Sequence, residues 1–144
     1  MVLHPDFPVV IGDYQITKAW RLVLPEQFNR RFEDDGLVLW RPQLTFWAIA
    51  WNNDQDSSME TRLASTLAAA SPHRGAEQIE RTSSLTRLTY ELPEEDPARS
   101  PSAYTSISAY AFSPTGHLQL SAYVDSPAAR SVAYQVIHSV QCAA

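Results

Sequence analysis

The residues that could bind a metal ion are concentrated after the last tryptophan. Asn52, Asn53, Asp54 and Asp56 supply oxygen atoms of the kind that Ca²⁺ prefers. The segment lacks the glycine and the distal glutamate of a standard calcium loop, so a polar loop that leads into a helix explains it better. The four histidines are scattered without a His-x-x-x-His pair, and one cysteine cannot build a zinc site. We therefore predict no metal and no cofactor.

Nucleophilic catalysis would need a serine or cysteine beside a histidine that a carboxylate orients. Serines are common, but no Gly-x-Ser-x-Gly turn occurs and only four glycines are present. His117 could share a sheet face with Ser121, although a solvated histidine after a turn explains it more simply. Cys142 fits an inert thiol. The sequence favours a noncatalytic protein and leaves open a catalytic site assembled from distant loops.

The four tryptophans all lie between Trp20 and Trp51. Three of them are predicted to share one side of a sheet, where they would form an apolar patch as large as many functional surfaces. Either the chain itself covers this patch or a partner does. Tryptophan and arginine are typical anchors of interfaces. We predict a binding surface for a protein partner or a second copy of the chain, with these anchors: Trp40, Arg41, Trp47 and Trp51.

The tyrosines support a second hypothesis. Tyr104, Tyr110 and Tyr123 are predicted to lie near Trp51 on a side of the sheet that is rich in hydroxyl groups. Aromatic walls edged by hydroxyl groups suit a small ligand with polar edges. The alternative function is therefore a small-molecule-binding domain or a weak enzyme.

The tryptophans are positioned by a predicted β-hairpin. Residues 37–41 and 44–51 are rich in β-branched and aromatic side chains and flank Pro42-Gln43. A two-residue turn there would place Leu39 opposite Phe46 and Val38 opposite Trp47. Both sides of the hairpin are apolar, as in strands at the centre of a sheet.

Hydrophobic periodicity predicts the remaining elements. Capping residues begin both predicted helices: the capping box Ser57-Ser58-Met59-Glu60, and Ser126 followed by Pro127. The elements are a strand at 14–24, a short helical turn at 26–32, a helix at 59–70, a hairpin of 78–82 with 85–92, a hairpin of 104–112 with 117–124, and a helix from 127 to 140.

The predicted fold class is α+β, with a single antiparallel sheet of about seven strands and two amphipathic helices. Both helices are expected to pack on one face, against the small apolar side chains of the last hairpin. One helix on each face would satisfy the same patterns. A chain of 144 residues fits one domain, 1–144, with a loose segment at 1–12 and a flexible, proline-rich loop at 93–102.

The charge balance excludes some partners. Eleven basic and 16 acidic residues give a net charge of -5, which disfavours binding to nucleic acid. No segment has the length and apolar character of a membrane span, and the first residues lack the pattern of a signal peptide. We expect no nucleic-acid partner, no membrane insertion and a cytoplasmic location.

The order of elements resembles a known family. The first strand closed by a proline, Trp20-Arg21-Leu22-Val23-Leu24-Pro25, and the final hairpin and helix ending near Ile137 are similar to the PsbP/DcrB-like domains. These are small antiparallel sheets with flanking helices. Members include photosystem subunits, a nuclear-transport cofactor and secretion-effector chaperones, which are mainly noncatalytic. The resemblance implies binding rather than catalysis and transfers no individual residue.

Overall fold

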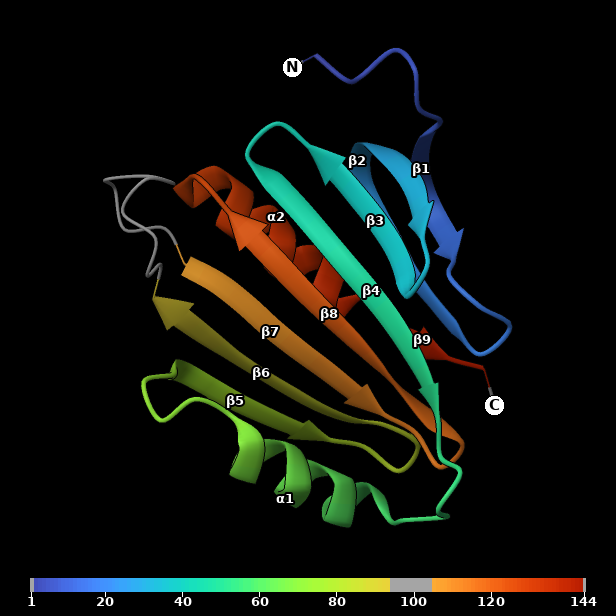
Figure 1. The fold of residues 1–144 in the computed structure, drawn as a ribbon, viewed down its shortest axis with the longest axis vertical. Coiled ribbons are helices and arrows are strands. Elements are labelled where there is room, and N and C mark those ends of the chain that lie inside the picture. Colours follow the sequence, from blue (N-terminus) through green and yellow to red (C-terminus); the bar gives the residue numbers. More distant parts are fainter. Residues whose placement is uncertain (1, 94–104, 144) are drawn as a thin grey trace.

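The computed structural model describes residues 2–93 and 105–143, which form one antiparallel sheet of nine strands and two helices. Across the sheet the strands run β1-β2-β3-β4-β8-β7-β6-β5, and β4 joins the two halves by pairing with β8 (Figure 1). The short β9 pairs with β2. Along the chain the elements are β1 (Val9–Gln15), β2 (Trp20–Glu33), β3 (Gly36–Arg41), β4 (Leu44–Asn52), α1 (Met59–Ala69), β5 (Gly75–Arg81), β6 (Thr86–Pro93), β7 (Thr105–Phe112), β8 (Gly116–Val124), α2 (Pro127–His138) and β9 (Gln141–Cys142).

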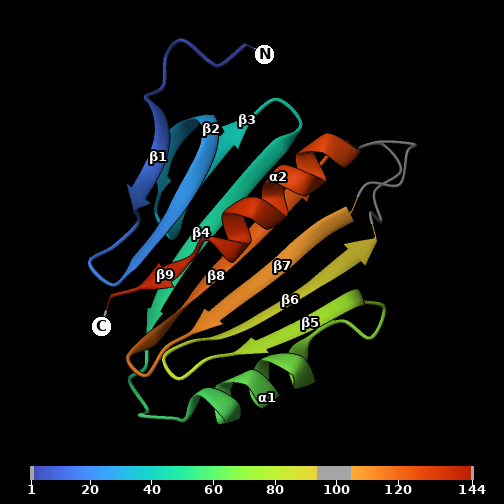
Figure 2. The ribbon, with the colours of Figure 1, turned by 180° about the vertical axis from the view of Figure 1, so that it is seen from behind.

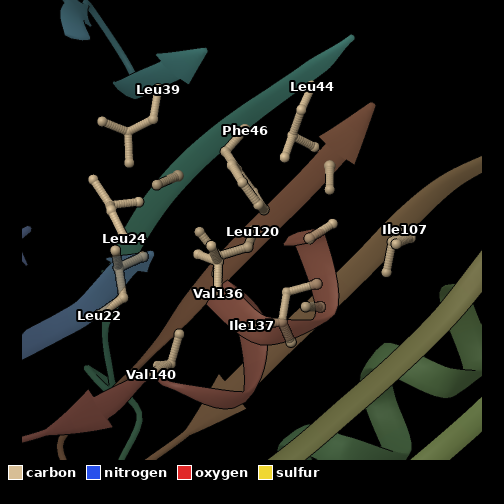
Figure 3. Packing of buried hydrophobic residues seen from close by; sticks show 14 of the residues in the cluster. Leu22, Leu24, Leu39, Leu44, Phe46, Ile107, Leu120, Val136, Ile137 and Val140 are labelled. Atoms are coloured by element: carbon tan, nitrogen blue, oxygen red, sulfur yellow. The ribbon is translucent and has the colours of Figure 1, made fainter. Parts of the chain in front are cut away.

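Helix α2 covers one face of the sheet and encloses the main core (Figure 2). Ala129 and Ala133 of the helix and Ala122 of β8 are completely buried. Small side chains on both surfaces let the helix axis approach the strands closely, which is the arrangement that the small apolar residues of the last hairpin predict. Larger side chains fill the space around this contact (Figure 3): Leu22, Leu24, Leu39, Phe46, Leu120, Val136 and Ile137.

Helix α1 packs on the opposite face. Ala111 belongs to the core under α2, whereas Phe112, the next residue of β7, packs in a cluster with Leu63 of α1. Successive strand residues point to opposite faces, so the two helices lie on different sides. The prediction that both helices pack on one face is wrong, and the alternative of one helix on each face is correct. The face predicted to be rich in hydroxyl groups also carries Leu88, Tyr90 and Phe112, which pack against α1.

The sheet has nine strands rather than about seven, because one predicted strand is in fact two and because the chain adds a short strand after α2. The predicted strand at 14–24 is split into β1 and β2 by a turn in which Thr17 Oγ1 accepts hydrogen bonds from the backbone N–H groups of Ala19 (3.1 Å) and Trp20 (3.2 Å). Threonine turns of this kind are hard to see in a sequence. Strand β9, only two residues long, was also not predicted.

The predicted helical turn at 26–32 is the second half of the long strand β2. Part of the segment expected to be loose, 1–12, forms β1. Asn29 of β2 is completely buried and fixes the residues before β1, since its Oδ1 accepts a hydrogen bond from His4 N (2.7 Å) and its Nδ2 donates to His4 O (3.0 Å). Pro93 ends β6, and the rest of the predicted flexible loop lies outside the described residues.

Both helices begin at serine residues. Ser126 Oγ accepts a hydrogen bond from Ala129 N (3.1 Å), and Pro127 occupies the first helical position, which confirms the predicted start of α2. At α1 the cap is Ser58, whose Oγ accepts from Thr61 N (3.0 Å). Glu60, predicted to complete this cap, pairs instead with Arg81 of β5.

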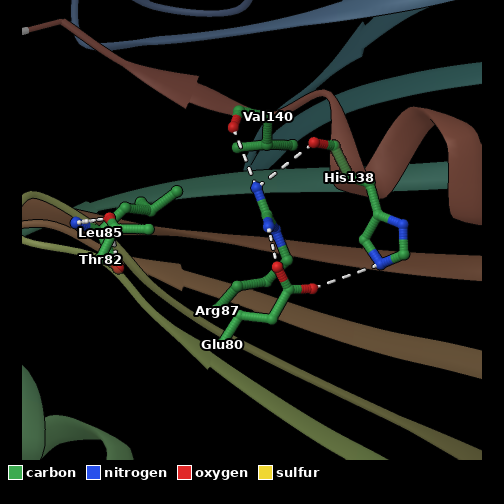
Figure 4. A network of polar contacts seen from close by, with 6 residues as sticks. All are labelled: Glu80, Thr82, Leu85, Arg87, His138 and Val140. Carbon is green, nitrogen blue, oxygen red and sulfur yellow. Dashed lines mark hydrogen bonds and ion pairs between the residues drawn. The ribbon is translucent and has the colours of Figure 1, made fainter.

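The end of α2 is held to the sheet by Arg87 of β6 (Figure 4). One guanidinium nitrogen of Arg87 donates to the carbonyl oxygens of His138 (3.4 Å) and Val140 (3.2 Å), and another lies 3.3 Å from Glu80 Oε2. A cation beside the last carbonyl groups of a helix is favourable because these groups carry partial negative charge. Arg87 therefore fixes the C-terminal end of α2 over the sheet.

Candidate functional site

The strand register gathers aromatic side chains on the face that α2 does not cover. Trp47 lies opposite Val38 of β3, as the two-residue turn predicts, and it lies opposite Ser121 of β8 on its other side. Residues 47, 49 and 51 follow one another on the same side of β4. We call this surface, at the centre of the sheet, the aromatic face, and define it by these residues: Trp40, Trp47, Ile49, Trp51 and Tyr123.

Neither helix covers the aromatic face. Helix α1 packs against β6 and β7, and its Arg62 reaches Gly116 at the start of β8. Trp51 keeps 50% of its surface exposed and Tyr123 keeps 40%, while Trp40 and Trp47 are half-buried. The indole ring of Trp51 is therefore open to solvent, whereas the rings of Trp40 and Trp47 are partly covered by the chain.

Arg31 of β2 is a member of this surface that sequence reasoning missed. Its guanidinium carbon lies 5.0 Å from the ring centroid of Trp40 and 5.7 Å from that of Trp47, which is cation–π geometry. Its Nε also pairs with Glu33 Oε1 at 2.6 Å. The tight Asp34-Asp35 turn was the signal that could have revealed it, because that turn places Arg31 opposite Val38.

Arg41, predicted as an anchor beside Trp40, lies on the other face. Residues 40 and 41 are consecutive in β3, so their side chains point to opposite sides. The Arg41 guanidinium is largely buried and forms an ion pair with Glu26 of β2. Arg41 therefore holds the edge of the core together and is not available on the aromatic face.

Trp51 stacks on His117 at the β8 end of the aromatic face. Their ring centroids are 6.0 Å apart with nearly parallel planes, and His117 also lies 5.6 Å from the Phe112 ring. The Nδ1 atom of His117 is buried and has no hydrogen-bond partner among the described residues. Burial lowers the pKa of His117 below its ordinary value of 6.5, and the positive charge of Arg62 lowers it further.

Arg62 of α1 joins the helix to the turn between β7 and β8. Its guanidinium donates hydrogen bonds to the carbonyl oxygens of Gly116 (2.8 Å), Ser57 (3.2 Å) and Ser113. Because these acceptors are neutral carbonyl groups, the positive charge of Arg62 is not cancelled by them. The uncancelled charge of Arg62 therefore acts on the imidazole ring of His117 and disfavours its protonation.

We expect the protonation of His117 to weaken the fold. Its pKa is depressed in the folded state, so stability is complete above pH 6.5 and declines as the pH falls from 6.5 toward the lower folded-state pKa. Imidazole NMR signals followed against pH should give a midpoint below 6.5 for His117, with His117→Gln identifying its signal. A midpoint at or above 6.5 would show that the ring is not desolvated.

The tyrosines predicted to line a small-molecule site are separated. Tyr110 lies under the edge of α1 between the rings of Tyr90 and Phe112, at 6.3 and 6.2 Å. Burial raises the pKa of Tyr110 to about 12, and a hydrogen bond with Tyr90 adds to the shift. Tyr123 lies on the open part of the sheet. Tyr104 lies outside the described residues.

The hollows of the surface also divide these residues. Tyr110 lines a groove of about 300 Å³ against Thr66 of α1. Trp51 lines a different hollow of about 250 Å³ with Trp20 at the end of the sheet. Trp40 lines a third, beneath the N-terminal residues. The aromatic face between these hollows is broad and open, which suits a large partner better than a small enclosed ligand.

Among residues 2–93 and 105–143, no group of three or more histidine, cysteine or carboxylate side chains is placed to hold a metal ion. Neither of the two helices described is long and apolar enough to cross a membrane.

No protein-family model matches the chain, and no curated protein matches its sequence.

Proposed function

We propose that the aromatic face is a noncatalytic binding surface for a segment of a partner protein. The observation that carries the proposal is the half-exposed indole of Trp51, which continues a row of apolar side chains on β4 that neither helix covers. Exposed apolar surface at the centre of a sheet is costly in water, and tryptophan is the residue most enriched among interface anchors. The resemblance to the mainly noncatalytic PsbP/DcrB-like domains supports the same class of function by analogy.

The charges around the face indicate the chemistry of the partner. Gly36 lies against Ala48 and Ile49, so the Asp34-Asp35 turn adjoins the aromatic face. Asp54 and Asp56 follow the C-terminal end of β4, shortly after Trp51. Arg31 is already paired with Glu33. With a net charge of -5 for the chain, the surface suits a partner segment that combines apolar and basic side chains.

The proposal gives each central side chain a role. Trp51 is the anchor that an apolar side chain of the partner would cover. Trp47 is supported by Arg31, which holds the ring in place and keeps part of its surface from water. Tyr123 of β8, which is diagonal to Trp47 of β4, adds an aromatic ring at the rim. An apolar centre with a polar and charged rim is the usual construction of a protein interface.

The test uses two synthetic amphipathic peptides with the same apolar residues, one with lysine and one with glutamate at its polar positions. Tryptophan fluorescence should report binding of the basic peptide, weakened by salt, and no binding of the acidic peptide. Trp51→Ser should lower the affinity about thirtyfold, the effect of losing an anchor worth about 2 kcal/mol.

The matched control is Phe32→Ser, which removes an aromatic side chain that is 67% exposed but lies on the other side of the sheet. This variant should bind like the wild type. Equal binding of both peptides would overturn the charge argument. Failure of the basic peptide to bind, or wild-type affinity in Trp51→Ser, would overturn the aromatic face as the binding surface.

A further inference from the structure

The two edges of the sheet are built differently. The edge strand β5 has three charged side chains, Glu77, Glu80 and Arg81, and α1 runs beside it. The opposite edge strand, β1, has a single charged side chain, Asp13, and no helix beside it (Figure 1). Natural sheets protect their edges from unwanted pairing with charges and covering elements. The β5 edge has both kinds of protection, whereas among the described residues the β1 edge has one charged side chain and no covering helix.

The outer edge of β1 offers free backbone groups. Arg30 N donates to Pro8 O (3.0 Å), and Ile16 N donates to Trp20 O (2.9 Å), which fixes the hydrogen-bonding pattern with β2 at both ends. Antiparallel pairs alternate between bonded and non-bonded positions, so residues 8, 10, 12, 14 and 16 direct their backbone groups toward β2. The N–H and C=O groups of Val9 and Ile11 therefore point away from the sheet.

The same positions carry exposed aliphatic side chains. Val9 is 46% exposed and Ile11 is 58% exposed, and Val23 of the adjoining β2 is 43% exposed. Val23 lies opposite Asp13, so it shares their side of the sheet. An unpaired row of backbone groups beside an aliphatic cluster is the kind of edge to which another strand adds.

We propose that this edge pairs with the β1 strand of a second copy of the chain, forming a two-fold symmetric dimer with a continuous sheet. Antiparallel pairing centred on Val10 sets Val9 of each copy opposite Ile11 of the other and joins the outward backbone groups of both residues. This register is self-complementary, since the same contact occurs twice. In this register Asp13 of one copy lies opposite position 7 of the other, so the two Asp13 carboxylates do not face each other. Gly12, with a positive φ of 79°, ends the regular stretch.

The dimer is expected to be weak. The paired stretch is short, and the contact is smaller than the roughly 1,600 Å² of a standard protein interface. The aliphatic side chains are only partly exposed in the single chain, so pairing adds a limited amount of apolar burial. We expect dissociation in roughly the micromolar range. The inference is independent of the proposed function, because the aromatic face remains open in the dimer.

Sedimentation velocity over a dilution series tests the proposal. The wild type should change from dimer to monomer on dilution, and Ile11→Lys should be monomeric at every concentration because the edge then carries like charges. The control Gln78→Lys adds the same charge to an exposed position of β5 and should dimerise like the wild type. Amide exchange at Val9 and Ile11 should slow as the wild-type concentration rises.

Trp47→Asp distinguishes a dimer formed through the β1 edge from one formed through the aromatic face. This variant should leave the edge dimer intact. A wild type that is monomeric at all concentrations overturns the edge dimer. Dimers that persist in Ile11→Lys but disappear in Trp47→Asp also overturn it and assign the contact to the aromatic face. Melting curves of the two variants confirm that each compared protein is folded.

Discussion

Phe46→Ala is expected to lower the free energy of unfolding by about 4 kcal/mol, the usual loss for a large aromatic side chain in a core. Phe46 is completely buried in the central strand β4. It lies opposite Leu39 on one side and Ala122 on the other, and its ring centroid is 6.0 Å from that of Phe28. Strands on both sides hold the surrounding backbone, so little collapse into the cavity is expected.

Urea denaturation at constant pH measures this loss. Phe32→Ala is the control, because Phe32 is 67% exposed at the end of β2, and its removal should change the free energy of unfolding by no more than about 0.5 kcal/mol. Similar losses for the two variants would show that Phe46 does not lie in the main core.

Gly116→Ala is expected to lower the free energy of unfolding by at least about 2 kcal/mol through steric overlap. A Cβ atom at this position would lie 2.3 Å from the carbonyl oxygen of Trp51. The obstacle is backbone on a paired strand, Asn52 being the direct partner of Gly116, so the start of β8 must move away from β4. The stacking of Trp51 on His117 should change as well, with an altered fluorescence spectrum.

Gly75→Ala is the matched control. No atom lies within 4 Å of a Cβ atom built at Gly75, and its φ is not positive. The free energy of unfolding should stay the same or rise by up to about 1 kcal/mol, because alanine restricts the unfolded chain. Equal effects of the two substitutions would contradict the close contact between β4 and β8.

Three hairpins could be predicted residue by residue. The pairs Leu39–Phe46 and Ile79–Leu88 are those that the short turns indicate, and the last hairpin has its predicted register. Register is strongly determined there because a shift of one residue would move every apolar side chain to the other face. In the Ser113-Pro114-Thr115-Gly116 turn, Gly116 is required for its close approach to β4 rather than for a left-handed backbone.

Tertiary features were less accessible to sequence reasoning. The pairing of β4 with β8 depends on strands that are far apart in the chain, and no local pattern specifies it. Helix α1 packs on the face that carries Phe112. In the sequence, the tyrosines and serines that share this side of the strand made the face look polar, so α1 was not expected there. Arg31 was assigned to a helical turn because Phe28 and Phe32 have helical spacing, and its contact with two indole rings was therefore missed.

The order of the strands has a consequence for how the chain folds. Within each half, β1 to β4 and β5 to β8, every strand pairs with its neighbour in sequence, so these contacts close short loops at small entropic cost. The seam between β4 and β8 joins the two meanders across a long stretch of chain, and together with the pairing of β2 and β9 it raises the contact order. We therefore expect the rate-limiting encounter in folding to be the meeting of two partly formed meanders along this seam.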